Sequence, residues 1–195
     1  MTTAAQTIEE DETTGVTIHI ELDTAGDAED PTTFGDGDYR VAGFNRRWTS
    51  YVDPDEFRLH PDASGHVTTD DIGLRRKLAV GTAFILSCYQ HSGVVWSLKG
   101  SGPQCQFDTA QVAGILFVPR VRGENLEKRA ERARDFLKTY NAWCNGEVYG
   151  LVAKRDGEVI DSLWGFYGYD DAQANVADFQ SGLTLEDGEE VTLAD

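Results

Sequence analysis

The sequence predicts an α+β domain in which an antiparallel sheet of about five to seven strands packs against one long amphipathic helix. Three observations lead to this class. Short apolar runs alternate with turn residues, one stretch of about 20 residues has helical periodicity, and an Asp-Gly pair separates two apolar runs near the C-terminal end. With 195 residues, 40% of them hydrophobic, the chain is long enough to bury a substantial core.

The predicted strands are short runs rich in β-branched and aromatic residues. The first alternates apolar and polar side chains, which is typical of a half-buried strand. The second and third flank a His-Ser-Gly turn, and the second is apolar enough to be a central strand buried on both faces. The last two flank Asp156-Gly157, a strong hairpin signal. The runs are Val16–Leu22, 78–90, Val94–Leu98, 112–118, 147–154 and 158–166.

Residues 124–144 are predicted to form the long helix, because apolar side chains recur there at steps of three and four. Those side chains are Leu126, Ala130, Ala133, Leu137, Tyr140 and Cys144. Gly146 is expected to end this helix. A short helix is predicted within 170–179, and 183–193 would add an edge hairpin or remain unstructured.

The closing hairpin is predicted to contribute core side chains. We expect Val148, Leu151 or Val152, Val159 and Trp164 to be buried. If alternation continues along the second strand, Trp164 and Phe166 share the inner face and Tyr167 shares the outer face with Tyr169.

The predicted domain boundaries follow the loss of hydrophobic patterning at both ends. Residues 1–14 are predicted to be a disordered acidic tail, 15–180 a single α+β domain, and 181–195 an acidic C-terminal extension. The longest apolar run falls short of the roughly 20 residues that a membrane span needs, and the first residues resemble no targeting peptide. Three widely spaced cysteines suit reduced thiols. The expected location is the cytoplasm of a host cell.

Charge is unevenly distributed along the chain. The net charge is −17, residues 1–39 and 156–195 each hold 11 acidic and no basic side chains, and all 17 basic side chains lie between Arg40 and Arg155. Two interpretations remain open. The acidity serves solubility or salt adaptation, or clustered carboxylates imitate the phosphates of nucleic acid. Direct nucleic-acid binding is disfavoured because phosphates would be repelled at long range.

Three segments follow one another in a recognisable order: YQHSG at 89–93, CQFDTAQVAG at 105–114, and YNAWCNGEVYG with DSLWGFYG between 140 and 168. Together they resemble a family of small proteins of phages, plasmids and other mobile elements, a family without an established activity. The resemblance covers about half the chain. Phe107 stands where the family pattern has Trp, and Leu163 where it has Cys. The resemblance implies a mobile-element setting and no particular reaction.

His91, Cys105 and Asp108 are the residue types of a base, a thiol nucleophile and an orienting carboxylate. Both segments that carry them lie at strand ends, so a Cys/His-dependent hydrolase or transferase is one alternative. The other interpretation is structural, with His91 opening a turn, Cys105 buried and Asp108 capping a turn. No glycine-rich oxyanion turn and no helix start follows Cys105, which favours the structural interpretation.

No cofactor is expected, and a zinc site is disfavoured. The candidate ligands would be Cys88, His91, Cys105 and Cys144, but only Cys88-x-x-His91 has ligand-like spacing. Two basic clusters, 75–77 and 120–122, are interpreted as a strand edge or as salt-bridge counterparts of the acidic ends.

The sequence therefore predicts a non-enzymatic binding protein of a virus or mobile element. Its expected partner is a host or defence protein with a cationic nucleic-acid-binding surface, for which it competes with nucleic acid. A structural or accessory role, with acidity only for solubility, is the second alternative beside the thiol enzyme. The partner-binding candidates are Asp161, Tyr167, Tyr169, Asp170, Asp171 and Asp178.

Overall fold

The computed structural model describes residues 6–11, 15–35, 39–62 and 66–183. The chain forms two compact units: unit 1 combines Met1–Glu29 with Ala142–Asp195, and unit 2 is Asp30–Asn141. The sequence predicts one domain over 15–180, whereas the structure divides this stretch. The reason is that strands from the two ends of the chain pair with each other, and the intervening residues build a core of their own.

The α+β class and the antiparallel pairing are confirmed. Instead of one sheet of five to seven strands, the described residues form two four-stranded sheets and one two-stranded sheet. Every strand pair in these sheets is antiparallel. None of the described helices has the length and apolar character needed to cross a membrane.

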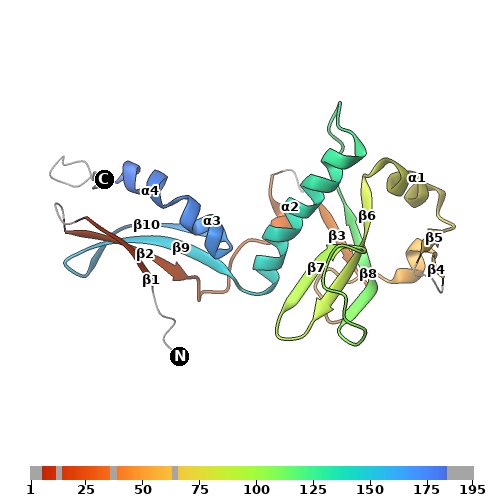
Figure 1. The fold of residues 1–195 in the computed structure, drawn as a ribbon, viewed down its shortest axis with the longest axis horizontal. Coiled ribbons are helices and arrows are strands. Elements are labelled where there is room, and N and C mark those ends of the chain that lie inside the picture. The colour runs from red at the N-terminus through yellow and green to blue at the C-terminus, as the bar shows by residue number, and fades with distance from the viewer. Residues whose placement is uncertain (1–5, 12–14, 36–38, 63–65, 184–195) are drawn as a thin grey trace. The chain divides into compact units, whose positions relative to one another are not determined.

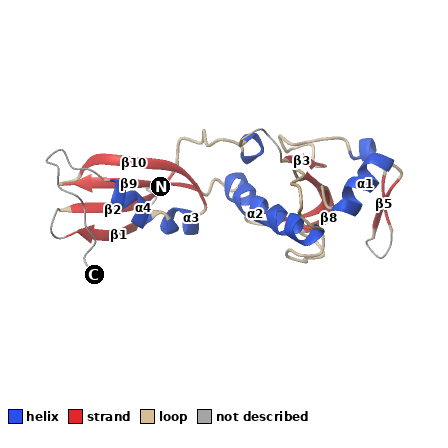
Figure 2. Ribbon diagram, turned by 90° about the horizontal axis from the view of Figure 1, so that it is seen from above, coloured by secondary structure: helices blue, strands red, loops and turns tan. Residues whose placement is uncertain are grey.

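Unit 1 is a four-stranded sheet with two short helices on one face (Figures 1 and 2). The strand order is β1-β2-β9-β10. Its elements are β1 (Gln6–Asp11), β2 (Val16–Leu22), β9 (Val148–Arg155), β10 (Glu158–Tyr167), α3 (Tyr169–Ala174) and α4 (Val176–Gly182). The prediction of disorder over 1–14 is therefore wrong for Gln6–Asp11, because β1 pairs with β2 through backbone hydrogen bonds that need no apolar pattern. The edge hairpin suggested for 183–193 falls beyond the described residues, except for Leu183.

The core of unit 1 lies between the sheet and its two helices. Alternate residues of β2 point into this core, as the sequence pattern predicts. Leu151 is fully buried there on β9, one of the two central strands, and Tyr149, Phe166 and Phe179 pack against the buried cluster. The buried members are Val16, Ile18, Ile20, Leu151, Ala153, Ala172, Val176 and Leu183.

The hairpin of β9 and β10 turns where the sequence predicts. Asp156 and Gly157 both have positive φ, 54° and 84°, as a two-residue hairpin loop with matching twist requires. The prediction that Val159 is buried is wrong: β10 is the edge strand, and Val159 is 59% exposed. Burial of Val148, Leu151 and Val152 is confirmed.

The prediction that Trp164 and Phe166 share one face is also wrong. The register of β10 shifts at Gly165, whose φ is 98°, so Trp164 lies opposite Gly150 whereas Phe166 lies opposite Tyr149. Neighbouring residues of a strand face opposite sides, and the bulge therefore turns Trp164 away from the core that Phe166 contacts. Trp164 is 46% exposed and lies against the backbone of Gly150, where a Cβ atom would meet its ring.

Unit 2 is built on the sheet β3-β8-β6-β7. The predicted central strand is confirmed, although it begins at Ala83, because Gly81 in the left-handed conformation ends a preceding helix. The elements are η1 (Pro31–Thr33), β3 (Arg40–Gly43), η2 (Pro54–Phe57), β4 (Leu59–Pro61), β5 (Val67–Thr69), α1 (Ile72–Val80), β6 (Ala83–Gln90), β7 (Val94–Leu98), β8 (Thr109–Phe117) and α2 (Leu126–Cys144), of which η1 and η2 are 3-10 helices.

Both faces of this sheet are covered. On one face, Ala83 and Ile115 pack with Phe57 and Leu74, which come from η2 and α1. The other face carries the buried Leu86 and Leu116, together with Trp96, whose ring lies 6.2 Å from the Tyr140 ring of α2. The long predicted helix is confirmed over Leu126–Cys144.

Asn141 fixes α2 to the edge strand β7. Its Oδ1 accepts a hydrogen bond from Trp96 N at 2.7 Å, and its Nδ2 donates to Trp96 O at 2.9 Å. The amide thus satisfies the free donor and acceptor of an edge strand as a neighbouring strand would.

Candidate functional site

The first candidate site lies where β6 ends and β8 begins. His91 follows β6 in the turn to β7, and its N–H donates to Gly93 O at 3.2 Å. Asp108 precedes β8, and its carbonyl accepts a hydrogen bond from Gln90 N at 2.9 Å. Because β6 and β8 are neighbours in the sheet, these adjacent ends bring His91 and Asp108 together.

Thr109 holds Cys105 in a turn beside them. The Thr109 hydroxyl accepts a hydrogen bond from Cys105 N at 3.0 Å and donates to Pro103 O at 2.9 Å. Thr109 N also donates to Cys105 O at 3.1 Å. The position of the thiol is therefore set by the backbone of the loop before β8.

Asp108 lies at the centre of this cluster. Its Oδ2 accepts a hydrogen bond from Cys105 Sγ at 3.4 Å and lies 3.7 Å from His91 Nδ1. The sequence predicts that these three side chains lie near one another, and the structure brings them together. It does not provide the order of a thiol protease, in which the imidazole contacts the sulfur and the carboxylate contacts the imidazole.

The chemistry of the cluster follows from this order. A thiolate and not a thiol is the attacking form of cysteine, whereas Cys105 here donates an S–H hydrogen bond to a carboxylate, which requires the thiol form. The His91 ring stacks on Tyr89 at 6.5 Å and its side chain is 69% exposed, so water reaches the site freely. The arrangement suits a turn held together by side chains better than a water-excluding reaction site.

Phe107 is a feature of this site that sequence reasoning missed. It lies between Cys105 and Asp108 in the chain and is 90% exposed. The signal was an aromatic side chain in the short loop between Cys105 and Asp108, where the predicted core does not need one.

The four candidate zinc ligands are divided between the units. Cys144 belongs to unit 1. In unit 2, Cys88 is buried in β6, and His91 and Cys105 lie in the cluster with Asp108. Within the described part of the chain, no three Cys, His, Asp or Glu side chains are grouped as a metal site would require.

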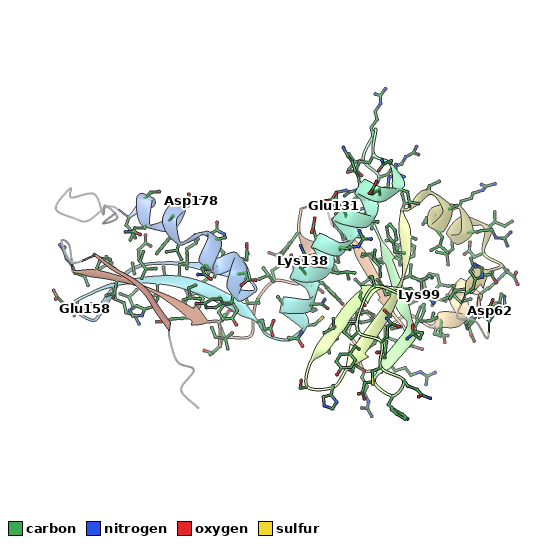
Figure 3. The ribbon with its side chains drawn as sticks, in the orientation of Figure 1. Asp62, Lys99, Glu131, Lys138, Glu158 and Asp178 are labelled. Carbon is green, nitrogen blue, oxygen red and sulfur yellow. The ribbon has the colours of Figure 1, made fainter. Side chains whose placement is uncertain are left out.

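The second candidate site is the surface of unit 1 formed by β10, α3 and α4. Asp161 is exposed on β10, Asp170 and Asp171 on α3, and Asp178 on α4, where Figure 3 labels it. Figure 3 also labels Glu158, at the turn end of β10. The predicted carboxylates are therefore available to a partner.

The two predicted tyrosines are less available. Tyr167 is half-buried, and its hydroxyl donates to Glu29 O at 2.6 Å. Tyr169 packs against the core of unit 1 and meets the Tyr149 ring edge-on at 5.8 Å. Both side chains contribute to the fold of unit 1, and the surface site is therefore one of carboxylates.

Comparison with known proteins finds no match to the chain among family models, curated proteins or solved structures.

Proposed function

We propose that unit 1 is the binding module of a mobile-element protein, and that it competes with nucleic acid for a cationic surface of a host defence or DNA-handling protein. The observation that carries this proposal is the segregation of charge by unit. Unit 1 has 20 of the 34 acidic but two of the 17 basic side chains, a net charge of −18, and unit 2 has the remainder, a net charge of +1.

The magnitude of this charge resembles that of a short duplex. B-DNA carries one negative charge per about 1.7 Å of its axis. The described residues of unit 1 hold 14 acidic and two basic side chains, a net charge of −12, which corresponds to about 20 Å of duplex. A compact domain of about 60 residues has a radius of gyration of about 11 Å and hence a diameter of about 27 Å. Its charge per unit length is therefore about three-quarters of that of a duplex, which supports competition for one cationic groove.

The carboxylates of the second candidate site are also uncompensated. Among the described residues, none of the ion pairs involves Glu158, Asp161 or the three aspartates of α3 and α4. An acidic surface that served solubility alone would not need to be confined to one unit, because solubility depends on total charge.

A competition experiment tests the proposal. A host extract fraction that binds immobilised duplex DNA is incubated with the full chain, and the amount released from the DNA is measured. The wild-type protein is expected to release part of the fraction, and the triple variant Asp170→Asn, Asp171→Asn, Asp178→Asn to release at least several-fold less, since each removed charge weakens a groove contact.

The control neutralises three exposed carboxylates of α2 in unit 2: Glu127→Gln, Glu131→Gln and Asp135→Asn. It changes the net charge equally, so it should release as much as the wild type. Equal release by both triple variants, or none by the wild type, would show that the acidity serves solubility or salt adaptation.

A second candidate function is a thiol enzyme at Cys105, favoured by the convergence of Cys105, Asp108 and His91. It requires a sulfur that reacts in the folded protein. Iodoacetamide should then modify Cys105 faster than a cysteine-containing peptide, and His91→Ala should slow the reaction. Modification no faster than that of the peptide contradicts this candidate.

A further inference from the structure

Unit 2 contains a cavity lined mainly by arginine. It lies between the loop that follows β8 and the first turns of α2, and its volume is about 380 Å³. Pockets that bind small molecules in proteins range from about 300 to 1,000 Å³. The lining residues are Arg120, Val121, Arg122, Gly123 and Arg129.

Arg129 is held in place by the backbone. Its Nη1 donates to the carbonyl of Val80 at the end of α1, and its Nη2 donates to the carbonyl of Glu124 at 2.6 Å. Its Nε is buried and has no hydrogen-bond partner in the part of the chain that the structure describes. A guanidinium has five N–H donors in one plane, so the two carbonyls fix the orientation of Arg129 and leave donors unused.

The other two arginines are exposed and uncompensated. Within the described residues, Arg120 and Arg122 form no ion pair, whereas the sequence suggested either a strand edge or pairing with the acidic ends. The carboxylate of Glu124, nearby in the chain, pairs with Arg132 at 2.8 Å. The cavity thus has three guanidinium groups and no carboxylate among its lining residues.

The start of α2 adds to this positive character. Asn125 precedes the helix, and its Oδ1 accepts a hydrogen bond from Lys128 N at 2.9 Å. Arg129 therefore extends from the first turns of a 19-residue helix, the end at which the helix dipole favours anions.

We infer that this cavity binds a small phosphate-containing anion with the charge of a diphosphate. Guanidinium forks match the oxygens of phosphate in pairs, and three of them balance a diphosphate of charge about −3. The volume suits a small molecule, and the net charge of −17 repels a long polyanion more than a short one. The inference concerns unit 2 and does not depend on the function proposed for unit 1.

Calorimetric titration of the full chain with pyrophosphate at low ionic strength tests this inference. The wild type should bind with a measurable affinity, and the double variant Arg120→Gln, Arg122→Gln should bind at least tenfold more weakly, because each charge-assisted hydrogen bond to phosphate is stronger than a neutral one. The control double variant Arg47→Gln, Arg134→Gln removes the same charge from exposed positions outside the cavity and should stay within about twofold of wild type.

Three outcomes overturn the inference. Absence of heat with millimolar pyrophosphate excludes a site. An equal loss of affinity in both double variants shows attraction to the overall charge of unit 2 and no defined site. Tighter binding of a ten-nucleotide single strand than of pyrophosphate, lost in Arg120→Gln, Arg122→Gln, assigns the cavity to nucleic acid instead. Circular dichroism of each variant verifies that its fold is retained.

Discussion

Units 1 and 2 are built on the same plan, a four-stranded antiparallel sheet with helices, but they differ in how the sheet is covered and in charge. The sheet of unit 2 is buried on both faces and its charges nearly cancel. Unit 1 has helices on one face, and its two basic residues include Lys154, whose Nζ lies 2.7 Å from Glu21 Oε1. Acidity in this protein is therefore a property of one unit.

The largest expected effect comes from truncating one fully buried side chain in the core of each unit. Leu151 in unit 1 and Ile115 in unit 2 are both fully buried, and Leu151→Ala or Ile115→Ala should cost about 3 kcal/mol of unfolding free energy. Hydrogen exchange measured peptide by peptide should show faster exchange only in the unit that carries the substitution. Equal acceleration in both units would mean that they unfold as one and that the comparison has no energetic meaning.

Two glycines sharpen the difference in packing. A Cβ at Gly114 would meet Ala42 O at 2.6 Å in the middle of the unit 2 sheet, whereas a Cβ at Gly150 would meet the ring of Trp164 at 2.3 Å. Shifting the backbone at Ala42 to relieve the clash would cost much free energy, whereas the half-exposed side chain of Trp164 can move away at low cost. Gly114→Ala should therefore cost about 2 kcal/mol and Gly150→Ala about 1 kcal/mol or less, as measured by urea unfolding. A larger destabilisation by Gly150→Ala than by Gly114→Ala would show that the packing of Trp164 against Gly150 is essential to unit 1.

Added salt should change the stability of the two units by different amounts, because they differ in net charge. Raising sodium chloride from about 0.02 M to 0.5 M screens the repulsion among the carboxylates of unit 1 and should stabilise that unit by about 1 kcal/mol, with little change in unit 2. Hydrogen exchange at the two salt concentrations measures this. A similar gain in both units would point to a general salt effect.

The smallest effect concerns Tyr149 in unit 1. Burial raises the pKa of the Tyr149 phenol, and the negative charges of Glu147 and of ionised Tyr169 raise it further. A folded-state pKa above the unfolded value of about 10 gives stability that is present below pH 10 and lost as pH rises through the folded pKa. Tyr149→Phe should reduce the loss of stability at alkaline pH in unit 1. Circular dichroism recorded from pH 9 to 12 measures this loss. An unchanged alkaline transition would contradict this.

The elements that could be predicted are those whose signal is local. Asp156-Gly157 specifies its hairpin through backbone conformation alone, and the spacing of apolar residues specifies α2. Elements that depend on distant partners could not be predicted. β1 has no apolar pattern and exists because β2 offers it an edge, and the division into two units follows from the pairing of β2 with β9.

A similar limit applies to the candidate sites. That His91, Cys105 and Asp108 would meet could be predicted, because the two segments that carry them adjoin strand ends. That the thiol contacts Asp108 rather than the imidazole depends on a turn set by Thr109, which a pattern of residue types does not encode. The prediction for Trp164 is wrong because the register shift at Gly165 reverses the face of the residues before it, as far as a second shift between Val159 and Asp161.

The division of unit 1 between the two ends of the chain has a consequence for synthesis. The hydroxyl of Thr17 in β2 donates to the carbonyl of Lys154 in β9, 137 residues further along. At translation rates of about 5–20 residues per second, β2 leaves the ribosome on the order of 10 s before its partner. All of unit 2 is made in that interval, so it can fold while the apolar face of β2 is still exposed. Carboxylates in the residues before β2 would help to keep this unpaired strand from aggregating.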